Sequence, residues 1–439
     1  MDPILYIIAI AFIMIPFFYS DIHHLDIMPL FFLYFDATSI FVKHYPSYQY
    51  LEYSLVLIIS LIYIFGQNSG RKLRGFGVFT FLLLVGLGIP IFQGVSLDPV
   101  LRNFSYTFAA MIMLPLGFDH YSKTGNIDKL LFFTFLFIVG NVLFVLFASP
   151  QRLGGFTSER FLGTTFYFGY VGIRGGVTTM GFVMLLTPLV FKVLKKYWQR
   201  IVFLMALGFV LVLFFFVLKR FVFLILGLGL LNYIFRKGLG RKYKIYLIGF
   251  FTLLSAIFFF DIGLQKSIEI RYEERGGENK FSEEVIATDL RIYEPLYVLK
   301  DTFNKTIDKV LIGESKRPVI DIKHGGYLIK EREIHNTYAG LIFTRGILGT
   351  FFYILIYVSL YRFAKKTYSK LKMRSKKFQN YWIVFQNLVL IFVLQGMVGG
   401  HSHITLRGLV FLYAGAIAGY FFHAFNKQRK YLIAQTYQK

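Results

Sequence analysis

The chain has 439 residues, 56% of them apolar and 19% aromatic, and it contains no cysteine. Its mean hydropathy of +0.57 excludes an ordinary soluble domain, and the missing cysteines exclude disulfide and thiolate chemistry. Apolar runs near the ~20 residues needed to cross a bilayer recur along the chain. We therefore expect an all-α polytopic membrane protein.

The net charge of +24 is unevenly distributed. Segment Gln265–Ile334 holds 14 of the 24 acidic residues and 13 of the 48 basic residues, which leaves 35 basic against 10 acidic residues elsewhere. Most of this excess lies in short loops between apolar runs, as is typical of cytoplasmic loops. The charge therefore indicates topology and contact with anionic lipid, and no nucleic-acid partner is expected. The basic segments are Arg71–Arg74, Lys192–Arg200, Arg236–Lys244, Arg362–Lys377 and Lys427–Lys439.

We expect about 12 to 13 transmembrane helices and one large extracytoplasmic loop. Three parts follow: an N-terminal bundle over 1–264, the loop over 265–334, and C-terminal helices with a basic tail over 335–439. One of the first three apolar segments is short enough to be interfacial. The expected spans are 3–19, 27–42, 51–66, 75–94, 99–118, 129–149, 166–191, 201–218, 221–235, 245–264, 338–361, 380–398 and 404–424.

The C-terminal spans determine the orientation. If the basic loop Arg362–Lys377 is cytoplasmic, the helix that begins near residue 338 enters from outside, and segment 265–334 is extracytoplasmic. Counting back places Lys219-Arg220 and Gln151-Arg152 at the outer surface as well.

The large loop contains an apolar pattern at three- and four-residue steps, which predicts an amphipathic helix at the membrane interface. Because proline is tolerated in a first turn, the regular helix is expected to begin at Pro295 and to stop at Gly313. Arg291 then lies near its beginning. The pattern is formed by Ile292, Leu296, Leu299, Phe303, Ile307 and Val310.

The pair His335-Asn336 follows this loop and precedes a long apolar run. An imidazole with an unperturbed pKa near ~6.5 suits proton transfer close to neutral pH. Taken alone, a histidine here is equally compatible with anchoring the end of a helix.

The order of these features resembles the O-antigen polymerase/ligase superfamily over roughly residues 150–424. The resemblance is carried by Arg220 after a span, Arg291 in LRIYEPLYVLKDTFNKTIDKVLIGES, and His335-Asn336 in HNTYAGLIFTRGILG with its glycines Gly346 and Gly349. Two positions depart from the pattern. Lys219 stands where the family usually has serine, and the turn Leu311–Ser315 lacks a second glycine.

The resemblance implies a GT-C-like architecture and glycosyl transfer on the outer face of the cytoplasmic (inner) membrane. The donor would be a glycan linked to undecaprenyl pyrophosphate, and the acceptor a glycan hydroxyl. Arginine suits a pyrophosphate leaving group because its guanidinium holds phosphate oxygens bidentately, so Arg220 and Arg291 are the first candidates. His335 would be the general base, oriented or assisted by Asn336. No cofactor is expected, and the transfer is predicted to be metal-independent and inverting.

Each of three further arginines has two possible roles. Arg152 and Arg174 are candidate phosphate or sugar contacts, or else structural arginines at or within the membrane, where insertion costs at least ~2.5 kcal/mol. Arg345 is a third phosphate contact or a side chain that extends to the membrane surface, and the second is favoured.

The favoured function is a polymerase of lipid-linked repeat units for O-antigen, capsule or exopolysaccharide, with a chain-length regulator as a candidate partner. A ligase that moves the glycan to a lipid or protein acceptor would use the same donor and residues. A non-catalytic transporter is less favoured, because it predicts inverted repeats and midplane polar sites.

Overall fold

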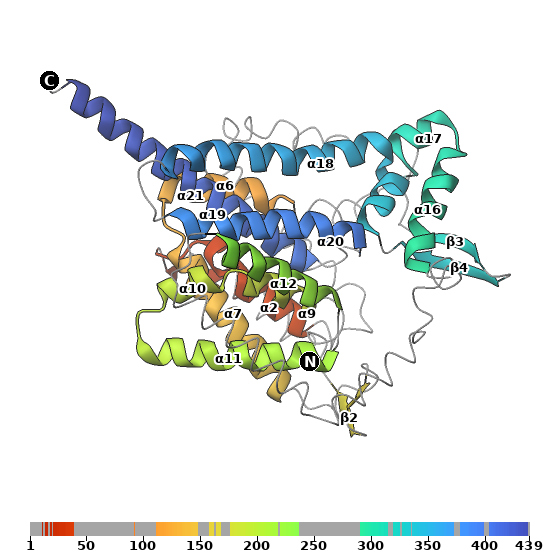
Figure 1. Cartoon of the computed structure of the whole chain (residues 1–439), viewed down its shortest axis with the longest axis horizontal. Helices are drawn as coiled ribbons and strands as arrows, with labels where there is room; N and C mark the ends of the chain where they lie inside the picture. The colour runs from red at the N-terminus through yellow and green to blue at the C-terminus, as the bar shows by residue number, and fades with distance from the viewer. Residues whose placement is uncertain are drawn as a thin grey trace.

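The computed structural model shows a bundle of helices with two short β-hairpins (Figure 1). Before residue 21 and between the ranges below, only a few isolated positions are described. The described ranges are 21–38, 111–147, 158–161, 164–167, 176–217, 220–236, 290–314, 319–324, 327–334, 336–372, 378–398 and 404–437.

Three helices among the described residues are long and apolar enough to cross a membrane, which identifies a helical membrane protein. They run over Thr337–Leu371, Gln379–Met397 and Thr405–Gln435. Shorter apolar helices lie over His24–Tyr34, Tyr197–Leu211 and Leu224–Phe235. The larger predicted number of spans remains a prediction, and the expected spans 3–19, 51–66, 75–94 and 245–264 lie outside the described ranges, apart from a few isolated positions.

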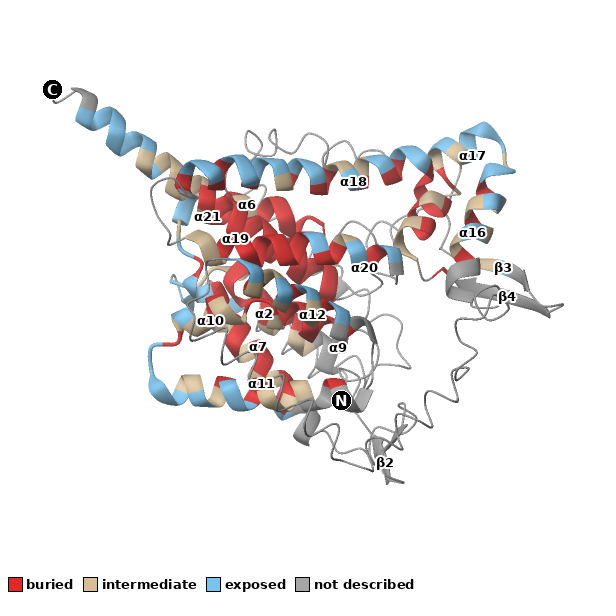
Figure 2. Cartoon of the chain, viewed as in Figure 1, coloured by how far each residue is buried: buried red, intermediate tan, exposed pale blue. Residues whose placement is uncertain are grey.

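The centre of the bundle is the contact between α6 (Met113–Thr124) and α21 (Ile404–Tyr437). A Cβ atom on Gly415 would lie 2.2 Å from the Leu114 carbonyl oxygen, and one on Gly419 2.4 Å from that of Phe118. Small residues spaced four apart thus let the two backbones approach closely, as in many membrane helix pairs. Figure 2 shows the buried residues concentrated around these helices and α19 (Gln379–Gln386).

Helix α2 (His24–Thr38) packs on α7 (Asp128–Phe147), and α11 (Tyr197–Val217) contacts the same helix. Polar side chains inside the bundle find partners across long sequence distances. The Tyr121 hydroxyl donates to Asp26 Oδ1 at 2.7 Å. The hydroxyls of Thr134 and Tyr413 lie 2.8 Å apart. These pairs satisfy polar atoms that would otherwise be costly to bury.

The predicted single span 166–191 is wrong. Strand β1 (Ser158–Phe161) pairs antiparallel with β2 (Thr164–Tyr167), so the first residues of that span belong to a hairpin. The helical part is divided into α9 (Gly176–Met184) and α10 (Thr187–Val193). Pro188 supplies the reason, because a proline near the beginning of α10 has no N–H to continue the preceding helix.

The segment after residue 289 also differs from expectation. Helix α16 (Leu290–Phe303) begins before Pro295 and contains it, and α17 (Ile307–Ile312) is a separate helix. Strands β3 (Val319–His324) and β4 (Tyr327–Glu333) form an antiparallel hairpin that the sequence reading did not anticipate. The predicted stop at Gly313 agrees with the end of α17.

Helix α18 (Thr337–Lys372) follows the hairpin, and the polypeptide then returns through α19, a π-helix η7 (Asn387–Ile391) and α20 (Phe392–Val398). Figure 1 places α16, α17 and the β3–β4 hairpin on the opposite side of the molecule from the C-terminal part of α21. We call the region where α16, the first residues of α18 and the last residues of α20 meet the α16 end.

Candidate functional site

Asn336 lies at the centre of the α16 end. Its Oδ1 atom accepts a hydrogen bond from the Ala339 N–H at 2.9 Å, which makes Asn336 the N-cap of α18. Its Nδ2 group donates to the Met397 carbonyl oxygen on α20 at 2.6 Å. Its own N–H donates to Oε1 of Glu294 on α16 at 3.4 Å. One side chain and its backbone therefore join three elements that lie far apart in the sequence.

Glu294 is almost completely buried, with 1% of its surface exposed. It lies on the inner face of α16 together with Val298 and Thr302. Two residues of the predicted apolar face, Leu296 and Phe303, point outward and are more than half exposed, whereas Leu299 is half-buried. The inner face of α16 thus buries a carboxylate and a hydroxyl beside Val298, and two large apolar side chains stay exposed on the outer face.

Helix α18 is broken at Gly346, and α17 ends in the break. Gly346 has φ 64° and ψ −172°, and Gly313 has a φ of 87° and a ψ of 179°. Only glycine adopts this region readily. A Cβ atom on Gly346 would lie 2.2 Å from the Leu311 carbonyl oxygen, and one on Gly313 2.3 Å from the Arg345 nitrogen. The two glycines therefore permit a main-chain contact, which the Glu314 N–H completes by donating to the Phe343 carbonyl oxygen at 2.8 Å.

Polar side chains continue from Asn336 into the bundle. The Tyr338 hydroxyl donates to the Val393 carbonyl oxygen at 2.9 Å, a second bond between α18 and α20. Deeper along α18, the Tyr357 hydroxyl donates to that of Tyr353 at 2.8 Å. Arg407 on α21, which was not among the predicted site residues, is also buried, with 6% exposure, and its charge acts on both tyrosines.

Arg345 is also buried, with 4% exposure. Its side chain packs inside the protein at the break in α18, so the favoured expectation that it extends to the surface is wrong. The break explains the difference, because α17 covers this part of α18.

The predicted site residues are only partly described. The backbone of Arg291 lies in the first turn of α16, one turn before Glu294, and its side chain lies outside the described residues. This places the Arg291 backbone at the same end of the molecule as Asn336. His335, which directly precedes Asn336, lies outside the described residues, as do Arg152 and Arg174. Their roles remain predictions.

Arg220 is the first residue of α12 (Arg220–Phe235), and its side chain is not described. The direction of α12 places its backbone. Near its last residues, Asn232 Nδ2 donates to Asn387 Oδ1 at 2.6 Å. Nearer its start, Val222 lies by Gly181 of α9. Phe182, which follows Gly181 in α9, packs on Phe392 of α20. Helix α12 therefore begins toward the end of α20 that Asn336 contacts.

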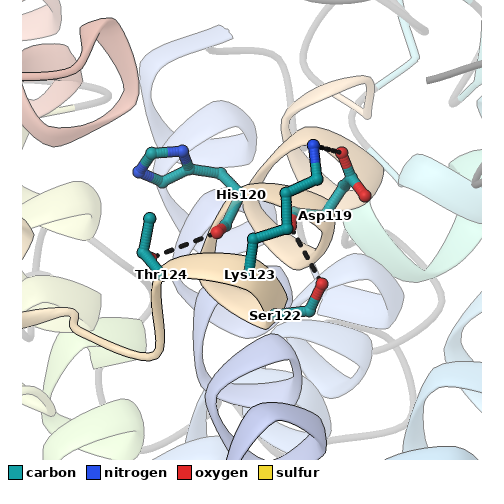
Figure 3. Close-up of polar contacts among 5 residues, drawn as sticks. All are labelled: Asp119, His120, Ser122, Lys123 and Thr124. Atoms are coloured by element: carbon teal, nitrogen blue, oxygen red, sulfur yellow. Dashed lines mark hydrogen bonds and ion pairs between the residues drawn. The ribbon is translucent and has the colours of Figure 1, made fainter. Parts of the chain in front are cut away.

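A second polar group surrounds the C-terminal end of α6. Figure 3 shows Lys123 paired with Asp119 at 3.1 Å, Ser122 Oγ donating to the Asp119 carbonyl oxygen, and Thr124 Oγ1 donating to that of His120. The His120 ring stacks on that of His23, with centroids 3.9 Å apart. Burial, with help from neighbouring positive charge, lowers the pKa of His23 to about 3 and that of His120 to about 4.

Within the described ranges, no group of three or more His, Asp or Glu side chains is arranged to hold a metal ion. No protein-family model matches the chain, and no curated protein matches its sequence. The fold and its apolar helices define a helical membrane protein, and any finer statement of function is a proposal.

Proposed function

We propose that this protein is a membrane glycosyltransferase that joins lipid-linked glycan repeat units on the outer face of the inner membrane. The observation that carries the proposal is the convergence at Asn336. Two segments of the glycan-transfer pattern meet there, α16 with Arg291 and the His-Asn segment that opens α18, and α20 joins them through Met397.

In the proposed reaction, the hydroxyl of the acceptor glycan attacks the anomeric carbon of the donor. The new C–O bond forms as the bond to the pyrophosphate oxygen breaks, so the configuration is inverted. His335 takes the hydroxyl proton, and undecaprenyl pyrophosphate leaves with the bonding electron pair. Arg291 and Arg220 stabilise the negative charge that develops on the leaving group.

The structure gives Asn336 a different task from the one first expected. Its amide caps α18 and ties it to α20, and it follows the proposed base His335 in the sequence. The proposed base role of His335 rests on the sequence resemblance.

The exposed apolar side of α16 and α17 supports the location. Ile307 is 78% exposed and Leu296 62% exposed, on helices packed directly against the membrane-spanning α18. We place this apolar surface in the outer leaflet, with the site at the level of the lipid headgroups.

The test is a reaction of the purified full-length protein with a defined undecaprenyl pyrophosphate-linked repeat unit. A ladder of longer lipid-linked chains, formed equally with a metal chelator present, is the expected product. His335→Ala should reduce the rate by about 10²- to 10⁴-fold, the usual contribution of a general base. His423→Ala, a histidine on α21 near the α6 end, is the matched control and should retain wild-type turnover.

Transfer that requires an added lipid or protein acceptor would identify a ligase instead. Absence of any covalent product from folded protein would rule out the enzyme proposal, and normal turnover of His335→Ala would rule out its role as base.

A further inference from the structure

Arg407 is a buried cation in a membrane-spanning helix. It is the fourth residue of α21, lies in the span Thr405–Gln435, and is 6% exposed. Placing arginine in a membrane helix costs at least ~2.5 kcal/mol, so such residues generally line a polar site or pathway. The family resemblance assigns this position no role.

The neighbouring rings determine which way Arg407 faces. Phe411, one turn later on α21, stacks on Tyr357 of α18 with centroids 5.7 Å apart. Residues four apart share one face of a helix, so Arg407 lies on the face of α21 that meets α18. Its charge accordingly acts on both Tyr353 and Tyr357, which lie one turn apart on α18.

A row of tyrosine side chains, formed by Tyr357, Tyr353 and Tyr338, lies between this place and the α16 end. The Tyr353 ring lies 6.5 Å from that of Tyr338, and Tyr338 follows Asn336 by two residues. The break at Gly346 makes this possible, because it turns the first part of α18 back toward the rest of the helix. Arg407 therefore lies at the inner end of this row, and Tyr338 lies at its other end, close to Asn336 in the sequence.

The chemistry of the row suits a phosphate group. A guanidinium remains charged at any physiological pH and holds phosphate oxygens in a fork, and tyrosine hydroxyls are additional donors. The surrounding apolar helices lower the local dielectric constant, which strengthens such bonds.

We propose that Arg407 and Tyr353 form a phosphate-binding site inside the bundle, which holds the pyrophosphate of a polyprenyl-linked substrate. The identity of this ligand rests on the proposed function. The buried position implies that the phosphate is reached along the row from Asn336, with the polyprenyl chain left in the lipid.

The test measures binding of undecaprenyl pyrophosphate to the purified full-length protein by native mass spectrometry. Arg407→Ala should weaken binding by about 10- to 100-fold, the effect of losing a hydrogen bond to a charged group. Tyr353→Phe should weaken it by about 10-fold. Arg429→Ala removes an exposed arginine from the same helix and should leave binding unchanged.

Three further probes separate the sources of the phosphate. Competition by inorganic pyrophosphate supports recognition of the phosphate itself. Neutral undecaprenol and phosphatidylglycerol should compete poorly, and strong competition by either would overturn the proposal.

The outcomes also separate this proposal from the function on which it rests. Tight binding by the wild-type protein with unchanged affinity in Arg407→Ala and Tyr353→Phe overturns the role of Arg407 alone. Failure of the folded wild-type protein to bind the lipid pyrophosphate overturns both. If Arg407→Ala does not fold, Arg407→Lys is the substitute test. Lysine keeps the charge but cannot hold two phosphate oxygens at once, so this variant should bind the lipid pyrophosphate at least ~3-fold more weakly than the wild-type protein.

Discussion

The protein contains two polar regions, one at the α16 end and one at the end of α6, and they are built differently. Arg407 and His423 mark their positions on α21, 16 residues or about 24 Å apart along the helix. At the end of α6, three bonds join residues three or four apart, and two more join Tyr121 to Asp26 and His423 to Ser122 across 95 and 301 positions. At the α16 end, the bonds of Asn336 and Tyr338 join residues 42, 61 and 55 apart.

Both regions bring distant segments together, so sequence separation alone does not show which of them is a site. The α6 end has strongly lowered histidine pKa values, a property often taken to mark function. Burial of two stacked rings accounts for those values, and the local bonds serve to finish a helix. The α16 end joins the helix that carries Arg291 to the residue that follows His335 in the sequence. This meeting of the segments that carry the predicted site residues favours the α16 end.

The largest stability effect that sharpens this comparison is expected from Gly346→Ala. A Cβ atom there would overlap the main chain of α17, and the backbone conformation alone costs alanine about 1 to 3 kcal/mol. We expect a lower Tm in detergent and faster hydrogen exchange in α16 and α17, with the α6 end unchanged.

Gly208→Ala in α11 is the matched control, because a Cβ atom at Gly208 would meet nothing within 4 Å. It should raise stability slightly, as helix propensity predicts. Equal Tm values for the two variants would show that the α17 contact with α18 does not hold the α16 end together.

A smaller effect, on the pH dependence of stability, is expected at the α6 end. Because the pKa values of His23 and His120 are lowered in the folded protein, the unfolded chain binds more protons below pH ~6.5. Stability should therefore decrease as the pH falls from about 6.5 toward 4.

The measurement is the Tm at several pH values for the wild-type protein and for the double variant His23→Asn, His120→Asn. The variant should lose part of the decrease below pH ~6.5. An identical pH profile in the two proteins would contradict the assignment of the shift to this stacked pair.

The smallest effects are expected from two lysines. At the α16 end, Lys305 pairs with Asp301 at 2.6 Å and Glu314 at 2.9 Å, and its ammonium lies 4.8 Å from the Phe343 ring. Lys305→Met should lower the free energy of unfolding by up to about 1 kcal/mol. Lys123→Met at the α6 end should lower it by about 0.3 to 0.5 kcal/mol, because a single exposed ion pair contributes little to stability. Tm values measured side by side check the order, and a larger effect at Lys123 would reverse it.

The ends of helices that are set by the local sequence could be predicted closely. Helices α7, α11 and α12 begin and end within four residues of the predicted spans 129–149, 201–218 and 221–235. Each follows an apolar run whose flanking charges or turns are visible in the sequence.

Features that depend on tertiary contacts could not be predicted. The early start of α16 is stabilised by burial of Glu294 against α18, which a pattern of apolar spacing does not reveal. Arg407 could not be related to Tyr353 from the sequence, because Tyr353 lies 54 positions earlier in the chain. In a long apolar run only its charge could have signalled it.

The central claim is that the α16 end, and not the α6 end, receives the lipid-linked substrate. Photo-crosslinking tests it directly, with an undecaprenyl pyrophosphate analogue that carries a photoreactive group next to the phosphates. Peptide mapping should locate the adducts in residues 334–345 and 404–411. Adducts concentrated in residues 119–128 would contradict the account and place the substrate at the α6 end.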